Sequence, residues 1–284
     1  MKTQHIPATD GYLLAAQVYA AKKEAGKGKV LIVNSATAVN KILYHHYANY
    51  MSDNGYHVIT YDYRGIAGSR PKKLRGFEAS FTHWGEKDFS GIIDYAITQF
   101  PNHKLVVFGH SIGGTIVGMN NRVDKISGVI NIGAQTAYYK DWASSEKTKL
   151  YLLWHVLLPF VSAIVGYFPG RAFKMTEDVP LGVIKQWHSR RLTKNMFDQF
   201  IENGHKLHYN QYKGKLLTLH MEDDPIGTLK AVQRIHDLFT VAHKELETIK
   251  PIDVPTNEIG HFGFFSRKFK PTLWPKTLKW FDEV

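Results

Sequence analysis

The chain has 284 residues, of which 44% are hydrophobic and 21% are charged, proportions typical of a soluble globular protein. It contains no cysteine, which excludes disulfide bonds and thiolate chemistry. The formal net charge is +11, but no nucleic-acid-binding motif accompanies the basic residues, so we expect no nucleic-acid partner. The opening stretch "MKTQHIPATDGYLL" has no apolar core of the kind found in signal peptides, and we expect a cytoplasmic protein.

Short apolar runs alternate with helical patterns along most of the chain. Asp10-Gly11 predicts a hairpin turn between two strand-like segments. Buried strands are predicted for "KVLIVN", "YHVITYD", "HKLVVFG", "ISGVINIG" and "GKLLTLHM". Helices are predicted between them from apolar residues at helical spacing: Leu43, Tyr47, Tyr50 and Met51; Phe89, Ile92, Ile93, Ala96, Ile97 and Phe100; and Ile226, Leu229, Val232 and Ile235. This alternation predicts an α/β fold, with a doubly wound and mostly parallel sheet covered by helices on both faces.

The alternation stops between Gln135 and Lys213. We interpret residues 135–213 as an insertion and residues 1–134 and 214–284 as one α/β core. The insertion contains Leu150–Phe168, a stretch without a charged residue whose length approaches that of a membrane span. A span would interrupt a sheet that the chain must re-enter, so we expect a helical cap, with one face on the core and another lining a cavity. Peripheral contact with a membrane is the alternative.

The segment "VVFGHSIGGT" carries the strongest chemical signal. Gly109-His110-Ser111-Ile112-Gly113 fits G-x-S-x-G, and it follows a predicted strand. A serine on such a strand-to-helix turn is held in a strained backbone conformation, and the residues two positions away must be small. This pattern predicts that Ser111 is a nucleophile.

A serine hydroxyl becomes a nucleophile only when a base takes its proton, and the base needs an orienting carboxylate. In chains with this type of turn, the serine is followed first by the acidic residue and then by the histidine. The strand "KLLTLHM" is followed by Glu222, Asp223 and Asp224. We prefer Asp224, because Asp-Pro-Ile at a strand exit fixes the turn, and we keep Asp223 as the alternative. The segment "HMEDD" lacks the spacing of metal ligands, so we expect no metal and no other cofactor.

Three histidines follow the acid. His236 falls within a helical pattern and His243 at the start of a strand, whereas His261 lies in the loop "EIGHFGFF". Gly260 and Gly263 allow close approach there. We therefore expect His261 to be the base.

These motifs resemble those of the α/β-hydrolase family over nearly the whole chain. The resemblance is strongest to a bacterial branch, mostly without assigned substrates, through "YDYRGIAGS", "GHSIGG", "DDPI" and "GHFGFF". It implies Ser111, Asp224 and His261 as the catalytic triad, and a cap inserted after "GVINIGA". The first motif, with Asp62, Arg64 and Ser69, is expected to brace a loop.

The resemblance also implies an oxyanion hole made of backbone N–H groups. One belongs to Ile112, the residue after the nucleophile. For the second we expect Ala36, with Thr37 as the alternative. The sequence departs from the family here, because Asn34-Ser35 stand where many members have His-Gly.

We expect a serine hydrolase that cleaves a carboxylic ester or a related acyl bond through an acyl-enzyme. Aromatic residues in the insertion indicate a small-molecule substrate with an apolar or aromatic portion. An acyltransferase or a carbon–carbon-bond hydrolase would use the same triad. A catalytically silent binding protein is the alternative from a different class.

Overall fold

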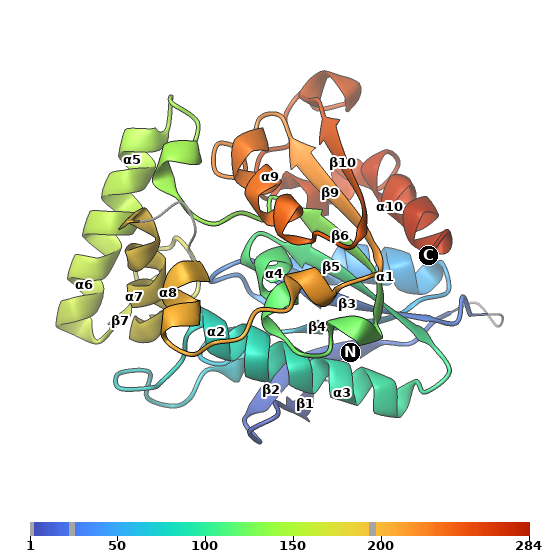
Figure 1. Ribbon diagram of the computed structural model, residues 1–284, viewed down its shortest axis with the longest axis horizontal. Coiled ribbons are helices and arrows are strands. Elements are labelled where there is room, and N and C mark those ends of the chain that lie inside the picture. The colour runs from blue at the N-terminus through green and yellow to red at the C-terminus, as the bar shows by residue number, and fades with distance from the viewer. Residues whose placement is uncertain (1–2, 23–25, 193–196) are drawn as a thin grey trace.

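The computed structural model describes residues 3–22, 26–192 and 197–284. Its centre is an eight-stranded sheet in the order β1-β2-β4-β3-β5-β6-β9-β10 (Figure 1). The strands are β1 (Gln4–Pro7), β2 (Leu13–Tyr19), β3 (Lys29–Asn34), β4 (His57–Tyr61), β5 (Lys104–His110), β6 (Ile126–Ile132), β9 (Lys215–Met221) and β10 (His243–Ile249). β1 and β2 pair antiparallel, β2 pairs antiparallel with β4, and the remaining neighbours run parallel. This is the α/β-hydrolase fold that the sequence predicts.

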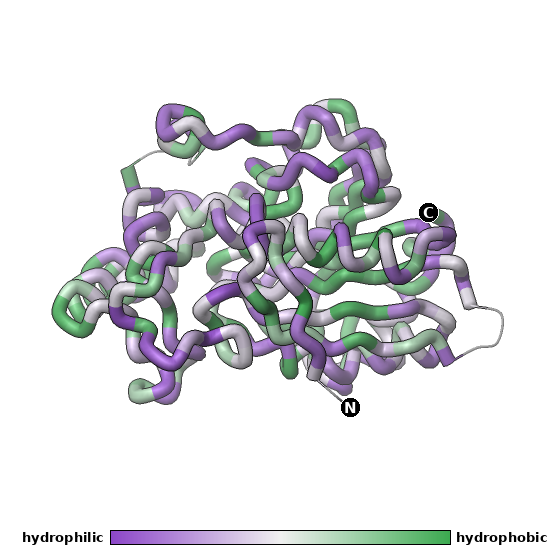
Figure 2. Tube along the Cα trace, turned by 90° about the horizontal axis from the view of Figure 1, so that it is seen from below, coloured by the Kyte–Doolittle hydropathy of each residue, from purple (hydrophilic) through white to green (hydrophobic). Residues whose placement is uncertain are grey.

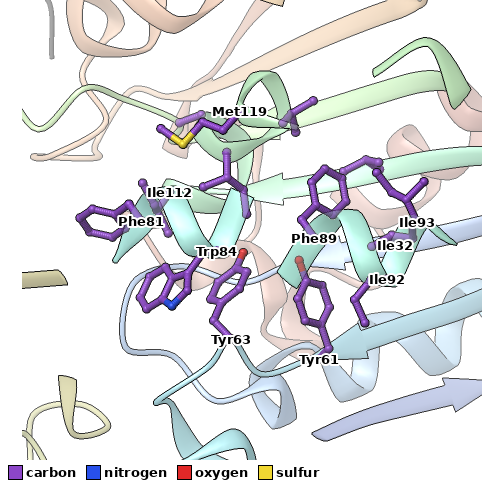
Figure 3. Close-up of a cluster of buried hydrophobic side chains, with 14 of the residues drawn as sticks. Ile32, Tyr61, Tyr63, Phe81, Trp84, Phe89, Ile92, Ile93, Ile112 and Met119 are labelled. Carbon is purple, nitrogen blue, oxygen red and sulfur yellow. The ribbon is translucent and has the colours of Figure 1, made fainter. Parts of the chain in front are cut away.

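The inner strands are apolar along their whole length because both faces of the sheet are covered. In β3, Val30 and Ile32 belong to one core cluster, and Leu31 and Val33 to the other. Figure 3 shows part of the first cluster, where the Tyr63 and Trp84 rings stack with centroids 4.6 Å apart. The second cluster includes buried residues of α1 (His45–Asp53) and α10 (Leu273–Asp282).

Helices connect the strands as the spacing predicts. Those of the core are α1 (His45–Asp53), α2 (Phe81–His83), α3 (Ser90–Gln99), α4 (Ile112–Thr115), α9 (Leu229–Leu238) and α10 (Leu273–Asp282), with a π-helical segment at Trp84–Phe89. The predicted hairpin is confirmed, and Gly11 provides its positive φ of 83°. Two details differ from expectation. Ile226 precedes α9 instead of lying within it, and the helix after Ser111 is short.

The helix α4 is short. Its four residues pass into a 3-10 turn at Ile116–Met119. Tyr209 lies so close to this turn that a Cβ on Gly118 would fall 2.2 Å from the tyrosine ring. Gly118, which has no side chain, permits this approach.

Within residues 135–213, the described residues 135–192 and 197–213 form a group of helices between β6 and β9 in the chain, on one side of the sheet (Figure 1). They comprise α5 (Lys147–Leu152), a π-helical segment (Leu153–Leu157), α6 (Leu158–Val165), α7 (Leu181–Ser189) and α8 (Phe197–Glu202), with the two-stranded sheet β7 (Tyr167–Phe168) and β8 (Val179–Pro180). Lys147–Val165 is one continuous helix of 19 residues, long and apolar enough to cross a membrane, yet only 17% of its most apolar window is buried. One face packs inward as expected, and the other faces solvent.

The segment "YDYRGIAGS" holds the loop after β4 by buried ion pairs. Nε of Arg64 lies 2.6 Å from Asp88, and its two terminal nitrogens donate to Asp10 at 2.8 Å. Asp62 accepts from the N–H and the ammonium of Lys41, each at 2.7 Å. The side chains of Asp62 and Asp88 are completely buried, so each carboxylate depends on its cationic partner.

We predict that Arg64→Leu lowers the free energy of unfolding by about 3–5 kcal/mol, because it leaves the buried Asp88 carboxylate without its partner. Arg122→Leu is the matched control, since it removes an arginine whose partner Asp94 is half exposed, and it should change stability by less than about 1 kcal/mol. Urea unfolding of the two variants measures both values. Equal losses would contradict the bracing role.

Candidate active site

Ser111 stands on a tight turn between β5 and α4. Its backbone has φ 54° and ψ −121°, a conformation that residues other than glycine rarely adopt. A Cβ on Gly113 would lie 2.2 Å from the carbonyl oxygen of Asn34, and one on Gly109 would lie 2.4 Å from the Cα of Gly114. Both glycines of the G-x-S-x-G motif are therefore required by the packing around this serine.

His261 and Asp224 form a buried acid–base pair. Nδ1 of His261 lies 2.6 Å from Oδ2 of Asp224, and the two side chains are 7% and 1% exposed. The second carboxylate oxygen accepts hydrogen bonds from the N–H groups of Ile226 at 2.9 Å and Gly227 at 2.8 Å. Burial alone would raise the pKa of Asp224, but His261 and these N–H donors outweigh it and lower the pKa below its usual value. An ionised Asp224 holds the proton on Nδ1 and leaves Nε2 as the proton acceptor.

The alternative residues occupy other places. Oδ2 of Asp223 accepts a 2.7 Å hydrogen bond from the N–H of Ile259, so this carboxylate fixes the loop that carries His261. His236 lies in α9 and pairs with the hydroxyl of Thr218, and His243 begins β10. The geometry thus favours Asp224 and His261.

Gly133 links the nucleophile turn to the acid–base pair. It follows Ile132, whose carbonyl accepts a 2.9 Å hydrogen bond from the N–H of Ser111. A Cβ on Gly133 would lie 3.0 Å from Cε1 of His261 and 3.1 Å from Oδ2 of Asp224. Ser111, Asp224 and His261 therefore gather near the carboxyl ends of β5, β6 and β9, where open α/β sheets bind their ligands.

A comparison with protein families finds a match over most of the chain. The family described as "Serine aminopeptidase, S33" (Hydrolase_4) matches residues 27–252. The chain belongs to this family of α/β hydrolases.

Two solved esterases share the fold of this hydrolase. The Pyrococcus furiosus esterase Pf2001 superposes with a TM-score of 0.63 at 15% identity, covering 99% of this chain and 92% of that one. The Exiguobacterium antarcticum esterase EaEST gives 0.56 at 16% identity and covers both chains completely.

A curated relative is the Danio rerio monoacylglycerol lipase ABHD2, 24% identical in an alignment of 231 residues that covers 72% of this chain. The chain spans about half the length of that relative.

The expected oxyanion donors of this hydrolase differ in whether their N–H groups already have a hydrogen-bond acceptor. Ile112 opens α4, so its N–H has no acceptor within the helix. The N–H of Ala36 donates a 2.8 Å hydrogen bond to the hydroxyl of Tyr44 and can hold an oxyanion only by sharing or leaving that bond. The N–H of Thr37 has no acceptor among the residues that the structure describes. Ala36 and Thr37 both remain candidates.

A hydrogen-bonded chain joins this turn to the base. The Tyr44 hydroxyl lies 2.9 Å from Nδ1 of His110, and Nε2 of His110 lies 2.8 Å from the carbonyl oxygen of His261. A carbonyl can only accept, so Nε2 of His110 carries the proton and Nδ1 accepts from Tyr44. Burial, with a smaller effect of the nearby His261 ring, lowers the pKa of His110 to about 3, which keeps the ring neutral.

No signal in the sequence marks Tyr44, His110 or Gly133 as part of the site. His110 occupies a variable position of the G-x-S-x-G motif, and Tyr44 precedes a helix without any motif of its own. Within the three described ranges, no group of three His, Asp or Glu side chains has a geometry that could hold a metal ion.

We predict that His110 makes the protein less stable at acidic pH. An unfolded histidine binds a proton near pH 6.5, whereas folded His110 resists protonation down to about pH 3. The unfolded state therefore binds more protons in this window, and stability is lost as the pH falls.

His110→Gln retains one donor and one acceptor but does not titrate. Urea unfolding between about pH 6 and pH 4 measures how steeply the free energy of unfolding rises with pH. This slope should be smaller in His110→Gln than in the parent by about 1.4 kcal/mol per pH unit. An unchanged slope would mean that His110 takes up its proton without unfolding.

Proposed function

We propose that the protein hydrolyses carboxylic esters or related acyl bonds through Ser111, His261 and Asp224. The observation that carries this proposal is the buried 2.6 Å contact between His261 and Asp224, near the end of the sheet where Ser111 occupies its strained turn. Fold stability requires no such pair beside a strained serine turn, whereas acyl transfer requires a base held in one tautomer.

The proposed reaction has two halves. Oγ of Ser111 attacks the carbonyl carbon while Nε2 of His261 takes its proton, and that proton then passes to the leaving alkoxide to release an alcohol. Water loses a proton to the same nitrogen and attacks the acyl-enzyme, and that proton then passes to Oγ of Ser111 as the acid is released. Asp224 orients the imidazole and stabilises its charged form in both halves.

Backbone N–H groups would hold the oxyanion of each tetrahedral intermediate. Ile112 supplies one, and the turn at Ala36–Thr37 the other. Each such donor contributes about 2.7–4 kcal/mol to transition-state stabilisation in enzymes of this type. If Ala36 is the donor, its hydrogen bond to Tyr44 must weaken as the oxyanion forms.

We assign residues 135–213 the role of a cap that selects the substrate. This segment begins just after Gly133, which contacts the acid–base pair. It is rich in packed aromatic rings, including Trp154 against Trp187 with centroids 4.4 Å apart. Such a surface suits an apolar or aromatic portion of a small ester. The relatives named as esterases and as a monoacylglycerol lipase support this substrate class.

We predict that two matched pairs of variants separate catalytic from neighbouring residues. With p-nitrophenyl esters of increasing chain length, Asp224→Asn should lower kcat/KM by about 10⁴-fold, and Asp223→Asn by less than about tenfold. His261→Ala should be as damaging as Ser111→Ala, about 10⁴-fold or more, while His243→Ala keeps the parent rate. A larger loss in Asp223→Asn or His243→Ala than in its partner would overturn the assignment.

Product analysis tests the rival chemistries on the same triad. In the presence of an added alcohol, a hydrolase yields the free acid, whereas an acyltransferase yields the new ester. A vinylogous diketone is a substrate only for a carbon–carbon-bond hydrolase. A folded parent that turns over none of these compounds would favour a silent binding protein.

A further inference from the structure

The helix Lys147–Val165 exposes an apolar face that no part of the described chain covers. Its inward side is set by His155, Leu158 and Ser162, which are at most 4% exposed. Its outward side carries five large apolar residues, each more than 40% exposed: Leu152 (54%), Val156 (51%), Leu157 (44%), Phe160 (65%) and Ile164 (61%). A surface helix of a soluble domain normally places polar residues there.

The apolar surface continues into the loop after the helix. Phe173 and Met175 are 49% and 48% exposed, and they alternate with the exposed Arg171 and Lys174. Figure 1 places α5 and α6 at the outer edge of the molecule, and Figure 2 shows hydrophobic colour along that edge. A continuous exposed apolar surface of this kind marks an interaction site.

Basic residues border this face at both ends. Lys147 and Lys149 lie at the start of the helix. At its other end, Arg75 donates a 2.9 Å hydrogen bond to the carbonyl of Ile164, and the exposed Lys72 and Lys73 precede Arg75 by three and two residues in the chain. Within the described residues, Lys72, Lys73, Arg75, Lys147 and Lys174 have no carboxylate partner. The acidic neighbours Glu146 and Glu177 are paired with Lys149 and Arg171.

We propose that this face docks on an anionic lipid bilayer, with the helix lying in the plane of the interface. An apolar helical face bordered by cations is the pattern of interfacial helices, in which apolar side chains enter the acyl boundary and cations meet lipid phosphates. Contact between two copies through this face would bring their unpaired cations together, which disfavours a second copy as the occupant.

The surrounding fold excludes a spanning orientation. In the sequence, the helix falls between β6 and β9. These two strands pair with each other along Gly128–Ile132, so both ends of the insertion join the same sheet. His155 also stacks on Trp142 with ring centroids 5.7 Å apart, and Trp154 packs on Trp187. Spanning would separate these contacts, whereas docking uses only the side that already faces solvent.

Vesicle co-sedimentation tests the proposal. The parent should bind vesicles of phosphatidylcholine containing about one-third phosphatidylglycerol at least tenfold more tightly than phosphatidylcholine alone, and added salt should weaken binding. The double variant Phe160→Asp/Ile164→Asp should lose at least tenfold in affinity. Lys72→Gln/Lys73→Gln should lose about fivefold for each charge removed.

The matched control is Val241→Asp/Ile252→Asp, which adds the same charges at positions that are 49% and 81% exposed and lie outside the insertion. It should bind vesicles like the parent, and so should Ser111→Ala, because docking does not depend on the proposed chemistry. Circular dichroism and urea unfolding confirm that each variant is folded.

Equal vesicle binding by parent and Phe160→Asp/Ile164→Asp would overturn the proposal. The proposal would also be overturned if the parent did not bind vesicles and sedimented as a dimer while Phe160→Asp/Ile164→Asp was a monomer. The face would then bind a second copy of the chain. Loss of ester hydrolysis with intact vesicle binding would leave this inference standing and remove the proposed function.

Discussion

The close approach of backbone around Ser111 is the constraint on which the active site depends. Gly113 packs against the carbonyl of Asn34, and Gly109 against Gly114, at separations that admit no Cβ. A positive φ at a residue other than glycine costs roughly 1–3 kcal/mol, and it persists because the surrounding strands fix the turn. That packing aims one serine toward the carboxyl edge of the sheet and leaves the N–H of Ile112 free beside it.

Asp224 and the loop that carries His261 are held in place by separate sets of hydrogen bonds. Asp224 is fixed by two N–H groups of its own turn, and Asp223 fixes the loop that carries His261. His110 ties the backbone of that loop, through Tyr44, to the turn at Ala36. The turn at Ala36, the turn at Ser111 and the loop that carries His261 are therefore joined by one hydrogen-bonded chain.

Local signals in the sequence predict the fold and the candidate triad, because strand periodicity, the G-x-S-x-G turn and the chain order of the triad each act over few residues. The bond between Tyr44 and Ala36 has no such signal, since it depends on how one turn folds back over the next. The outer face of Lys147–Val165 could not be predicted for a different reason. A helix that is apolar all round looks like buried core, and only its place at the edge of the fold shows which side meets solvent.

The central claim is that Ser111 is the nucleophile of a serine hydrolase, and covalent labelling tests it most directly. The folded parent is treated with a fluorophosphonate, digested, and mapped by peptide mass spectrometry. The account predicts one phosphonyl adduct, on the peptide that contains Ser111, and no adduct there in Asp224→Asn over the same time because the base is no longer held in its tautomer. An adduct on another residue, or none in the folded parent, would contradict it.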